Sequence, residues 1–180
     1  MNKILITGGP GTGKTTLVDE LRKKGYVCSE EIVRNLTLKK RKEGFDQYFL
    51  TDPLDFSKKL FNQRLSEYNK DYNSDLVIYD RGPIDVLAYL NFKSIEIPKN
   101  LIIKSKKIAY QYAFILNPWK DIYSQDEVRY ESFEECLSIH NFLINEYKKF
   151  NIKLISVPNG TINQRVSSNQ NYPGQTQSYK

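Results

Sequence analysis

The chain has 180 residues, of which 39% are hydrophobic and 27% are charged; this length and composition indicate one globular domain with a full core. No apolar run approaches the ~20 residues that a membrane-spanning helix needs, and the first apolar segment follows Met1 so closely that no cleavable signal is expected. The two cysteines form no C-x-x-C pattern and favour a reducing, cytoplasmic location, the single histidine excludes a histidine-rich metal site, and the net charge of +6 suits an anionic ligand.

Residues 3–7 form a short apolar run that predicts a buried parallel strand. The motif G-x-x-x-x-G-K-T follows at residues 8–15, and the next turns place Leu17, Val18 and Leu21 on one face of a helix. Strand, glycine-rich loop and helix in this order predict the phosphate-binding loop of P-loop hydrolases and kinases. A chance glycine-rich turn is the alternative, and it is disfavoured because both flanking elements are present.

This loop predicts that the ligand is a nucleoside triphosphate, ATP or another, bound with Mg²⁺. The backbone N–H groups of the loop lie at the start of a helix, where the helix dipole favours anions. Lys14 is expected to reach the β- and γ-phosphates and the Thr15 hydroxyl to hold the metal, whereas Thr16 is expected to serve the helix more than the metal. The predicted nucleotide-binding residues of this segment are Gly9, Pro10, Gly11, Thr12, Gly13, Lys14, Thr15 and Thr16.

The next predicted elements are a short strand at residues 26–28 and a polar helix from about residue 30 to residue 41. Glu31 and Arg34 share one face of that helix at i, i+3 spacing. Both are candidates for binding the phosphoryl acceptor, with Glu31 as an alternative catalytic base, although a surface ion pair explains the spacing equally well. A further helix is expected to begin at Pro53, with Asp52 as its N-cap.

A continuous apolar strand at residues 76–79 ends at Asp80, which can hold the Mg²⁺ shell or take the proton of an acceptor hydroxyl. The alternative is a capping aspartate without a ligand. Arg81 follows directly and presents a planar fork of donors that suits a phosphate. Asp85 lies one helical turn later and is a candidate for contact with the acceptor, although an acid at a helix N-terminus is an equal explanation.

Residues 98–108 predict another helix, and residues 110–116 predict the fourth strand. The polar and aromatic segment at residues 119–130 has no strong periodicity and is interpreted as a mobile lid. Lys120 and Arg129 are the cations that this lid would bring over the phosphates, with Asp126 pairing with or orienting Arg129. A plain connecting loop is the alternative.

Ser132 and Glu135 form a capping box at the start of a long helix that ends near residue 149, and residues 153–157 predict the fifth strand. Arg165 follows that strand, where loops often wrap a nucleotide base, and is a candidate to stack on it. The domain is expected to span residues 1–166, with the polar residues 167–180 as a disordered tail. The expected buried face of the long helix comprises Phe133, Cys136, Leu137, His140, Leu143, Ile144 and Tyr147.

The alternation of strands and helices predicts an α/β fold of three layers, with a five-stranded parallel sheet between helices on both faces. Ligands of such sheets bind beyond the carboxyl ends of the strands. The glycine-rich loop and Asp80 both follow strands directly, so the candidate residues are expected to meet at that edge.

These motifs together resemble the small P-loop ATPase and kinase-like family known as AAA-type domain 28, or NadR-like, over about residues 2–166. The resemblance implies the fold of nucleoside and nucleotide kinases, with strand order 2-3-1-4-5, an acid–arginine pair at Asp80–Arg81 and Glu31 near the acceptor. Unlike AAA+ motors, the sequence has no separate helical lid domain and no recognisable second-region arginine finger. The resemblance rests on residues 8–16, Glu31-x-x-Arg34, Asp80-Arg81-Gly82-x-x-Asp85, Asp126-x-x-Arg129 with residues 132–135, and Val157-Pro158-x-Gly160.

The leading interpretation is a kinase that moves the γ-phosphoryl group of ATP to a small nucleoside- or nucleotide-like acceptor, with Lys14, Asp80, Arg81 and Arg129 as catalytic residues. A regulatory nucleotide-binding switch with a protein or lipid partner is the second interpretation, and a polynucleotide end kinase is the third. The positive charge leaves nucleic acid open as a partner, but no nucleic-acid-binding motif supports it.

Overall fold

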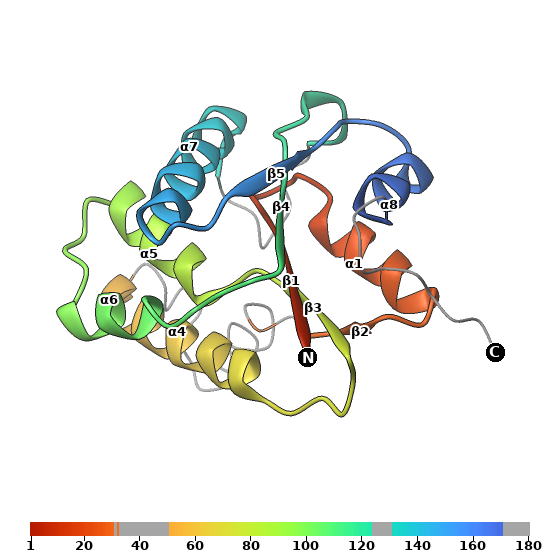
Figure 1. The fold of residues 1–180 in the computed structure, drawn as a ribbon. Helices are drawn as coiled ribbons and strands as arrows, with labels where there is room; N and C mark the ends of the chain where they lie inside the picture. Colours follow the sequence, from red (N-terminus) through yellow and green to blue (C-terminus); the bar gives the residue numbers. More distant parts are fainter. Residues whose placement is uncertain (31, 33–50, 124–130, 171–180) are drawn as a thin grey trace.

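The computed structural model describes residues 1–30, 32, 51–123 and 131–170. Five parallel strands form one sheet in the order β2-β3-β1-β4-β5, which confirms the expected fold class and strand order (Figure 1). The register pairs Ile6 of β1 with Asp80 of β3, and Gly8 of β1 with Leu116 of β4. The strands are β1 (Asn2–Gly8), β2 (Val27–Cys28), β3 (Leu76–Asp80), β4 (Tyr112–Leu116) and β5 (Leu154–Val157).

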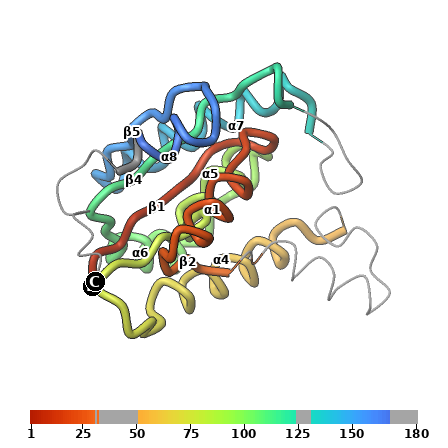
Figure 2. The backbone as a smooth tube through the Cα atoms, turned by 90° about the vertical axis from the view of Figure 1, so that its right-hand side faces the viewer, coloured from red at the N-terminus to blue at the C-terminus, as the bar shows by residue number. Residues whose placement is uncertain are grey.

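Helices cover both faces of this sheet. One face carries α1 (Lys14–Lys23) and α8 (Ile162–Gln170), which lie side by side in Figures 1 and 2. The opposite side carries α5 (Pro83–Phe92) and α7 (Phe133–Lys149), with α4 (Pro53–Asn69) and α6 (Lys99–Ser105) packed around α5. A short 3₁₀ helix, η1 (Lys120–Ile122), follows β4.

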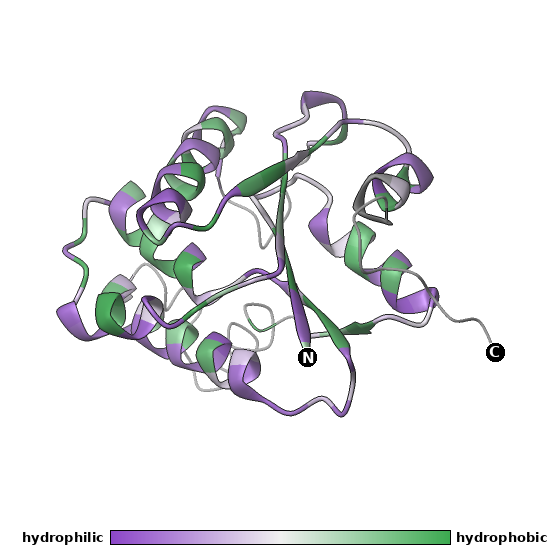
Figure 3. Cartoon of the chain, in the orientation of Figure 1, coloured by the Kyte–Doolittle hydropathy of each residue, from purple (hydrophilic) through white to green (hydrophobic). Residues whose placement is uncertain are grey.

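The central strand shows why the sheet is covered on both sides, because alternate residues of a strand point to opposite faces. Ile4 and Ile6 pack in the same cluster as Leu17 of α1, whereas Leu5 packs in the cluster of Ile84 of α5. All five side chains are at most 2% exposed. The apolar strands are the green arrows between the helices of Figure 3. The continuous apolar run of β1 is therefore explained by burial of this strand on both faces of the sheet.

The helix starts follow the capping signals of the sequence. The Asp52 carboxylate accepts a hydrogen bond from the backbone N–H of Asp55, with Pro53 at the first helical position of α4. Ser132 and Glu135 exchange both bonds of the expected capping box at the start of α7. Within the part of the chain that the structure describes, no helix is long and apolar enough to cross a bilayer.

Three expectations need correction: the buried face of α7, the residue at which the tail begins and the start of the fourth strand. Leu137 and Ile144 of α7 are 44% and 39% exposed, whereas the unexpected Ile139 is fully buried, because the helix face on α5 and the sheet is narrower than its apolar composition indicates. The tail was expected to begin at residue 167, but α8 runs from Ile162 to Gln170, and Val166 of this helix packs into the cluster that contains Leu17 of α1. The fourth strand begins at Tyr112 and not at residue 110.

Candidate functional site

The predicted phosphate loop connects β1 to α1 at the carboxyl edge of the sheet. Gly11 and Gly13 have φ angles of 70° and 81°, a left-handed conformation that glycine adopts without strain. Gly13 is also the N-cap of α1 and supplies no side-chain cap. The first N–H groups of α1 are therefore not capped by this residue, which is the arrangement that an anion at a helix N-terminus requires.

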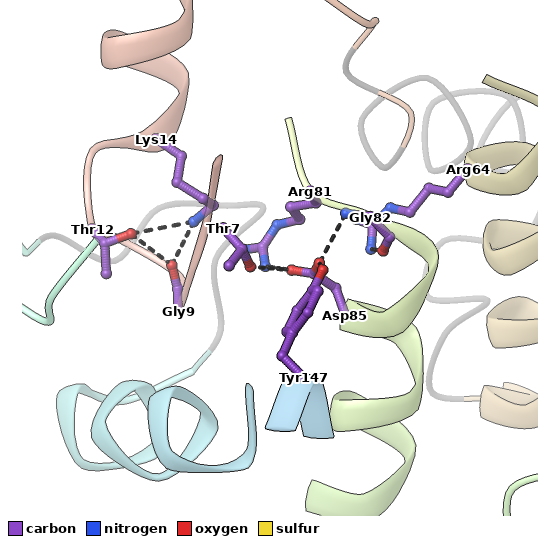
Figure 4. A network of polar contacts seen from close by, with 9 residues as sticks. All are labelled: Thr7, Gly9, Thr12, Lys14, Arg64, Arg81, Gly82, Asp85 and Tyr147. Atoms are coloured by element: carbon purple, nitrogen blue, oxygen red, sulfur yellow. Dashed lines mark hydrogen bonds and ion pairs between the residues drawn. The ribbon is translucent and has the colours of Figure 1, made fainter. Parts of the chain in front are cut away.

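Lys14 folds back over the loop that precedes it (Figure 4). Its Nζ donates to the Gly9 carbonyl at 2.5 Å and to Thr12 Oγ1 at 3.3 Å, and the residue is 7% exposed. Burial lowers the pKa of Lys14 well below its usual range and the charge of Arg81 lowers it further, while Asp80 and Asp85 act in the opposite direction. A bound anion would favour the charged form of this amine, because it would supply the negative charge that burial removes from water.

Asp80 and Arg81 lie at the end of β3, next to the loop in the sheet. The N–H of Asp80 donates to Ser29 Oγ at 3.0 Å, and the N–H of Arg81 donates to the Ile6 carbonyl at 2.9 Å. Arg81 has a φ of 66°, a conformation that costs free energy in a residue with a side chain and is concentrated at functional sites. The chain thus turns sharply where β3 ends, and Asp80 stays partly exposed at that turn.

The Arg81 guanidinium is held from two sides. Its Nη1 pairs with Asp85 Oδ1 at 3.3 Å, its Cζ lies 5.7 Å from the Tyr89 ring centre, and the side chain is 14% exposed. Burial alone would lower the pKa of Arg81, but Tyr89, Asp85 and Asp80 outweigh it and raise the pKa above its ordinary value. Arg81 therefore remains a cation with a fixed orientation.

Asp85 lies at the centre of the polar network in Figure 4 and is fully buried. Thr7 Oγ1 donates to its Oδ1 at 2.5 Å, and its Oδ2 accepts from the Gly82 N–H at 2.8 Å and from the Tyr147 hydroxyl at 2.5 Å. Together with Arg81, four groups occupy this carboxylate. Asp85 thus has the contacts of an acid at the start of α5, and its carboxylate orients Arg81. Its contact with an acceptor stays a prediction.

Arg64 is a site residue that sequence reasoning missed. It lies on α4, is 5% exposed, and its Nη1 donates to the Gly82 carbonyl at 3.3 Å. Burial lowers the pKa of Arg64, and the negative charge of Asp85 opposes this effect. For Asp85, burial alone would raise the pKa, but the charges of Arg64 and Arg81 keep it below its ordinary value. The available signal was an arginine in the apolar stripe of α4, between Phe61 and Tyr68, where a charge is buried only when it is paired.

The Arg165 side chain contacts the phosphate loop, whereas the sequence suggested that it stacks on the nucleotide base. The residue is 4% exposed, and its Nη2 donates to the Thr12 carbonyl at 2.7 Å. A Cβ on Gly13 would lie only 2.8 Å from its Nη1. The guanidinium therefore packs against the phosphate loop itself.

The remaining candidates fall into three groups. Thr15 and Thr16 are exposed in the first turn of α1, and Lys120 is exposed in η1. Glu31, Arg34, Asp126 and Arg129 lie outside the described residues, as does most of the predicted lid. Gly9, Pro10 and Gly11 form the first half of the loop, where a Cβ on Gly9 would meet Cys136 Sγ at 2.8 Å and one on Gly11 would meet the Tyr123 ring at 2.5 Å.

The residues present fit a magnesium-bound nucleotide. Mg²⁺ commonly takes only one or two protein oxygens and completes its shell with phosphates and water, and the exposed Thr15 and the partly exposed Asp80 supply such oxygens beside the loop. Among the described residues, no cluster of three or more His, Cys, Asp or Glu side chains could hold a metal ion by itself. An ion at this edge would therefore depend on phosphate oxygens and water for its remaining ligands.

Comparisons with known proteins identify the family of this chain and the proteins that share its fold. The sequence model of the family AAA_28, described as an AAA domain, matches residues 3–165, while a comparison with curated proteins finds no match. The fold superimposes on deoxyadenosine kinase from M. mycoides with bound dCMP and dCDP, with a TM-score of 0.70 and 16% identity over 94% of this chain and 97% of that chain.

Two other solved structures share the fold. The NadR protein in complex with NR gives a TM-score of 0.69 at 18% identity, over 96% of this chain and 52% of that chain. Thymidylate kinase from Ehrlichia chaffeensis gives a TM-score of 0.61 at 18% identity, over 94% of this chain and 97% of that chain. Identities this low show a common fold, and the chemistry must be argued from the site.

Proposed function

The chain belongs to the AAA_28 family of AAA domains, and on that premise we propose that it is a phosphotransferase. It would bind ATP with Mg²⁺ and move the γ-phosphoryl group to a small acceptor of nucleoside or nucleotide type. The observation that carries this proposal is the grouping of two cations, the buried Lys14 and the mostly buried Arg81, with the carboxylate of Asp80 at the carboxyl edge of the sheet. Phosphoryl transfer requires mainly positioning and charge neutralisation, and this grouping provides both.

Each group has a specific proposed role. Lys14 would neutralise the β- and γ-phosphates, and Arg81 would stabilise the charge that develops during transfer, from the orientation that Asp85 fixes. Thr15 and Asp80 would hold Mg²⁺, which supplies further neutralisation of the phosphate oxygens when bound. Asp80 is also close enough to the cluster to serve as the base for an acceptor hydroxyl, so its two roles remain alternatives.

The acceptor class is supported by the names of the structural neighbours. Deoxyadenosine kinase and thymidylate kinase are named for a nucleoside and a nucleotide, and the NadR structure contains NR. Glu31 and Arg34 are proposed as acceptor contacts and Arg129 as a cation of the closing lid, on the basis of the sequence alone.

The proposal is tested by product formation. The protein is incubated with ATP and Mg²⁺ and with separate pools of nucleosides, nucleoside monophosphates, ribosylnicotinamide and 5′-hydroxyl oligonucleotides, and phosphorylated products are separated by anion-exchange chromatography. We expect transfer to one small-molecule pool, and none by Lys14→Met protein purified in parallel. Equal, slow release of phosphate with every pool would refute the proposed phosphotransferase and favour a regulatory nucleotide-binding switch. Phosphorylation of the oligonucleotides alone would favour a polynucleotide end kinase.

A further inference from the structure

Two carbonyl groups of the phosphate loop are bonded from outside by side chains that are distant in sequence. Arg165 Nη2 of α8 donates to the Thr12 carbonyl at 2.7 Å, and the Cys136 thiol of α7 donates to the Pro10 carbonyl at 3.0 Å. Arg165 is 4% exposed and Cys136 is fully buried. The orientation of these two peptide groups is therefore set by tertiary contacts and not only by the loop sequence.

These two carbonyl contacts also determine the direction in which the next N–H groups of the loop point. No described peptide bond is cis, and in a trans peptide the C=O and N–H point to opposite sides. The Thr12 carbonyl faces Arg165, so the N–H of Gly13 points away from the guanidinium. By the same argument, the N–H of Gly11 points away from Cys136. These are loop N–H groups of the kind that a P-loop presents to phosphate.

We infer that Arg165 is a positioning residue for the triphosphate, which acts through the Thr12–Gly13 peptide group. A charged donor on a carbonyl oxygen makes a stronger hydrogen bond than a neutral one, and bonds in a chain polarise one another. The guanidinium therefore fixes the plane of this peptide and strengthens its N–H as a donor to phosphate. This inference rests on the proposed nucleotide binding, and it replaces a role for Arg165 in stacking on the base.

The peptide itself can be observed without any nucleotide. Carbonyl-¹³C threonine combined with ¹⁵N-glycine labels both atoms of a peptide bond only at Thr7–Gly8 and Thr12–Gly13, so the Gly8 signal is an internal reference. In Arg165→Met, which keeps the length of the aliphatic stem, we expect the Thr12 carbonyl and Gly13 nitrogen resonances to shift upfield because the peptide loses polarisation. Arg165→Lys should restore part of the shift. Unchanged Thr12–Gly13 resonances would overturn the inference.

Binding tests the functional half of the inference. Calorimetry with Mg²⁺ compares ATP with inorganic tripolyphosphate, which has no base. The hydrogen bond from the Gly13 N–H to a charged phosphate oxygen is charge-assisted, and Arg165→Met no longer holds that N–H in place, so this variant should weaken both ligands to a similar degree, by about 10-fold or more. A loss confined to ATP would show that Arg165 contacts the base, and the positioning role would be wrong.

Two control variants separate this role from a general effect of charge or packing. Lys23→Met removes one cation from the far end of α1, where the side chain is 75% exposed. Val166→Ala loosens the neighbouring buried residue of α8 and leaves the guanidinium in place. We expect both controls to bind tripolyphosphate within about 3-fold of wild type. If Val166→Ala matches Arg165→Met in binding and in the Gly13 signal, α8 packing explains the effect and the inference fails; if wild type binds neither ligand, the proposed function fails first.

Discussion

Replacing Asp85 by asparagine, which keeps its shape and removes its charge, should destabilise the protein strongly. Asp85 is fully buried, and its carboxylate is shared by the Arg81 ion pair and three hydrogen bonds. Asp85→Asn leaves the guanidiniums of Arg64 and Arg81 without this counter-charge. Removing one partner of a buried ion pair costs about 3–5 kcal/mol, and asparagine can still accept one of the hydrogen bonds. We therefore expect the free energy of unfolding to fall by about 3 kcal/mol.

Urea unfolding at neutral pH measures this loss, and Asp19→Asn is the matched control. Asp19 pairs with Arg22 at 2.6 Å, but both side chains are about half exposed (51% and 47%), so its pair contributes about 1 kcal/mol at most. The reasoning would be refuted if the two substitutions had equal effects, or if Asp85→Asn lost less than about 1 kcal/mol.

The difference in the free energy of unfolding between wild type and Asp85→Asn should also depend on pH, which gives an independent check. Although burial would raise the pKa of Asp85, Arg64, Arg81 and the hydrogen bonds of Thr7 and Tyr147 lower it. A carboxyl whose pKa is lower in the folded state contributes stability above its unfolded pKa, near 3.9, and loses it as the pH falls through the folded pKa. The gap between wild type and Asp85→Asn should therefore be constant near neutral pH and narrow in acid below about pH 4. A gap that widens in acid would contradict this sign.

Four other substitutions test neighbouring contacts. Lys14→Met should abolish transfer and weaken ATP binding in calorimetry, because the buried amine faces the loop; retained transfer would remove Lys14 from the site. Arg81→Ala should lower kcat by about 10²-fold with a smaller change in KM for ATP, and a raised KM with unchanged kcat would indicate a role in ground-state binding instead. Tyr147→Phe removes one donor to Asp85 and should cost about 1–2 kcal/mol in urea unfolding, with no loss if the bond is dispensable. Arg64→Met should be at least about 1 kcal/mol less harmful in the Asp85→Asn background than in wild type, whereas additive effects would separate the two residues.

The sequence was sufficient for those parts of the fold that depend on local patterns. Pro53 and the Ser132–Glu135 capping box marked the starts of α4 and α7 correctly, because each is a local signal. The apolar runs located the strands to within about two residues of their ends, whereas the strand order came from the family resemblance. The position of the glycine-rich loop between β1 and α1 could also be predicted, since its motif consists of consecutive residues. What the sequence did not provide were contacts across long separations, such as Arg64 with Gly82 and Tyr147 with Asp85.

The same distinction applies to residues whose contacts or burial differ from what their position in the sequence indicated. Arg165 and Asp85 were both recognised as candidates from their positions after strands, but position alone does not say which way a side chain points. Asp85 points inward because Thr7, at an inward position of β1, and Tyr147 of α7 offer donors to it. Leu137 and Ile144 were assigned to the core because composition cannot distinguish the edge of an apolar helix face from its centre.

The charge balance of the site connects its stability with its proposed function. Lys14 and Arg64 are buried cations, and Arg81 is 14% exposed. In addition to burial, the charge of Arg81 lowers the pKa of both Lys14 and Arg64, whereas the carboxylates of Asp80 and Asp85 raise it. Burial lowers the pKa of Lys14 and of Arg64, so the folded protein bears a cost for keeping both charged. A polyanion bound beside them would offset that cost in the folded state alone, and a ligand that binds only the folded state stabilises it by mass action. A site built in this way gains stability from the ligand it is proposed to bind, because a triphosphate supplies negative charge to cations that burial removes from water.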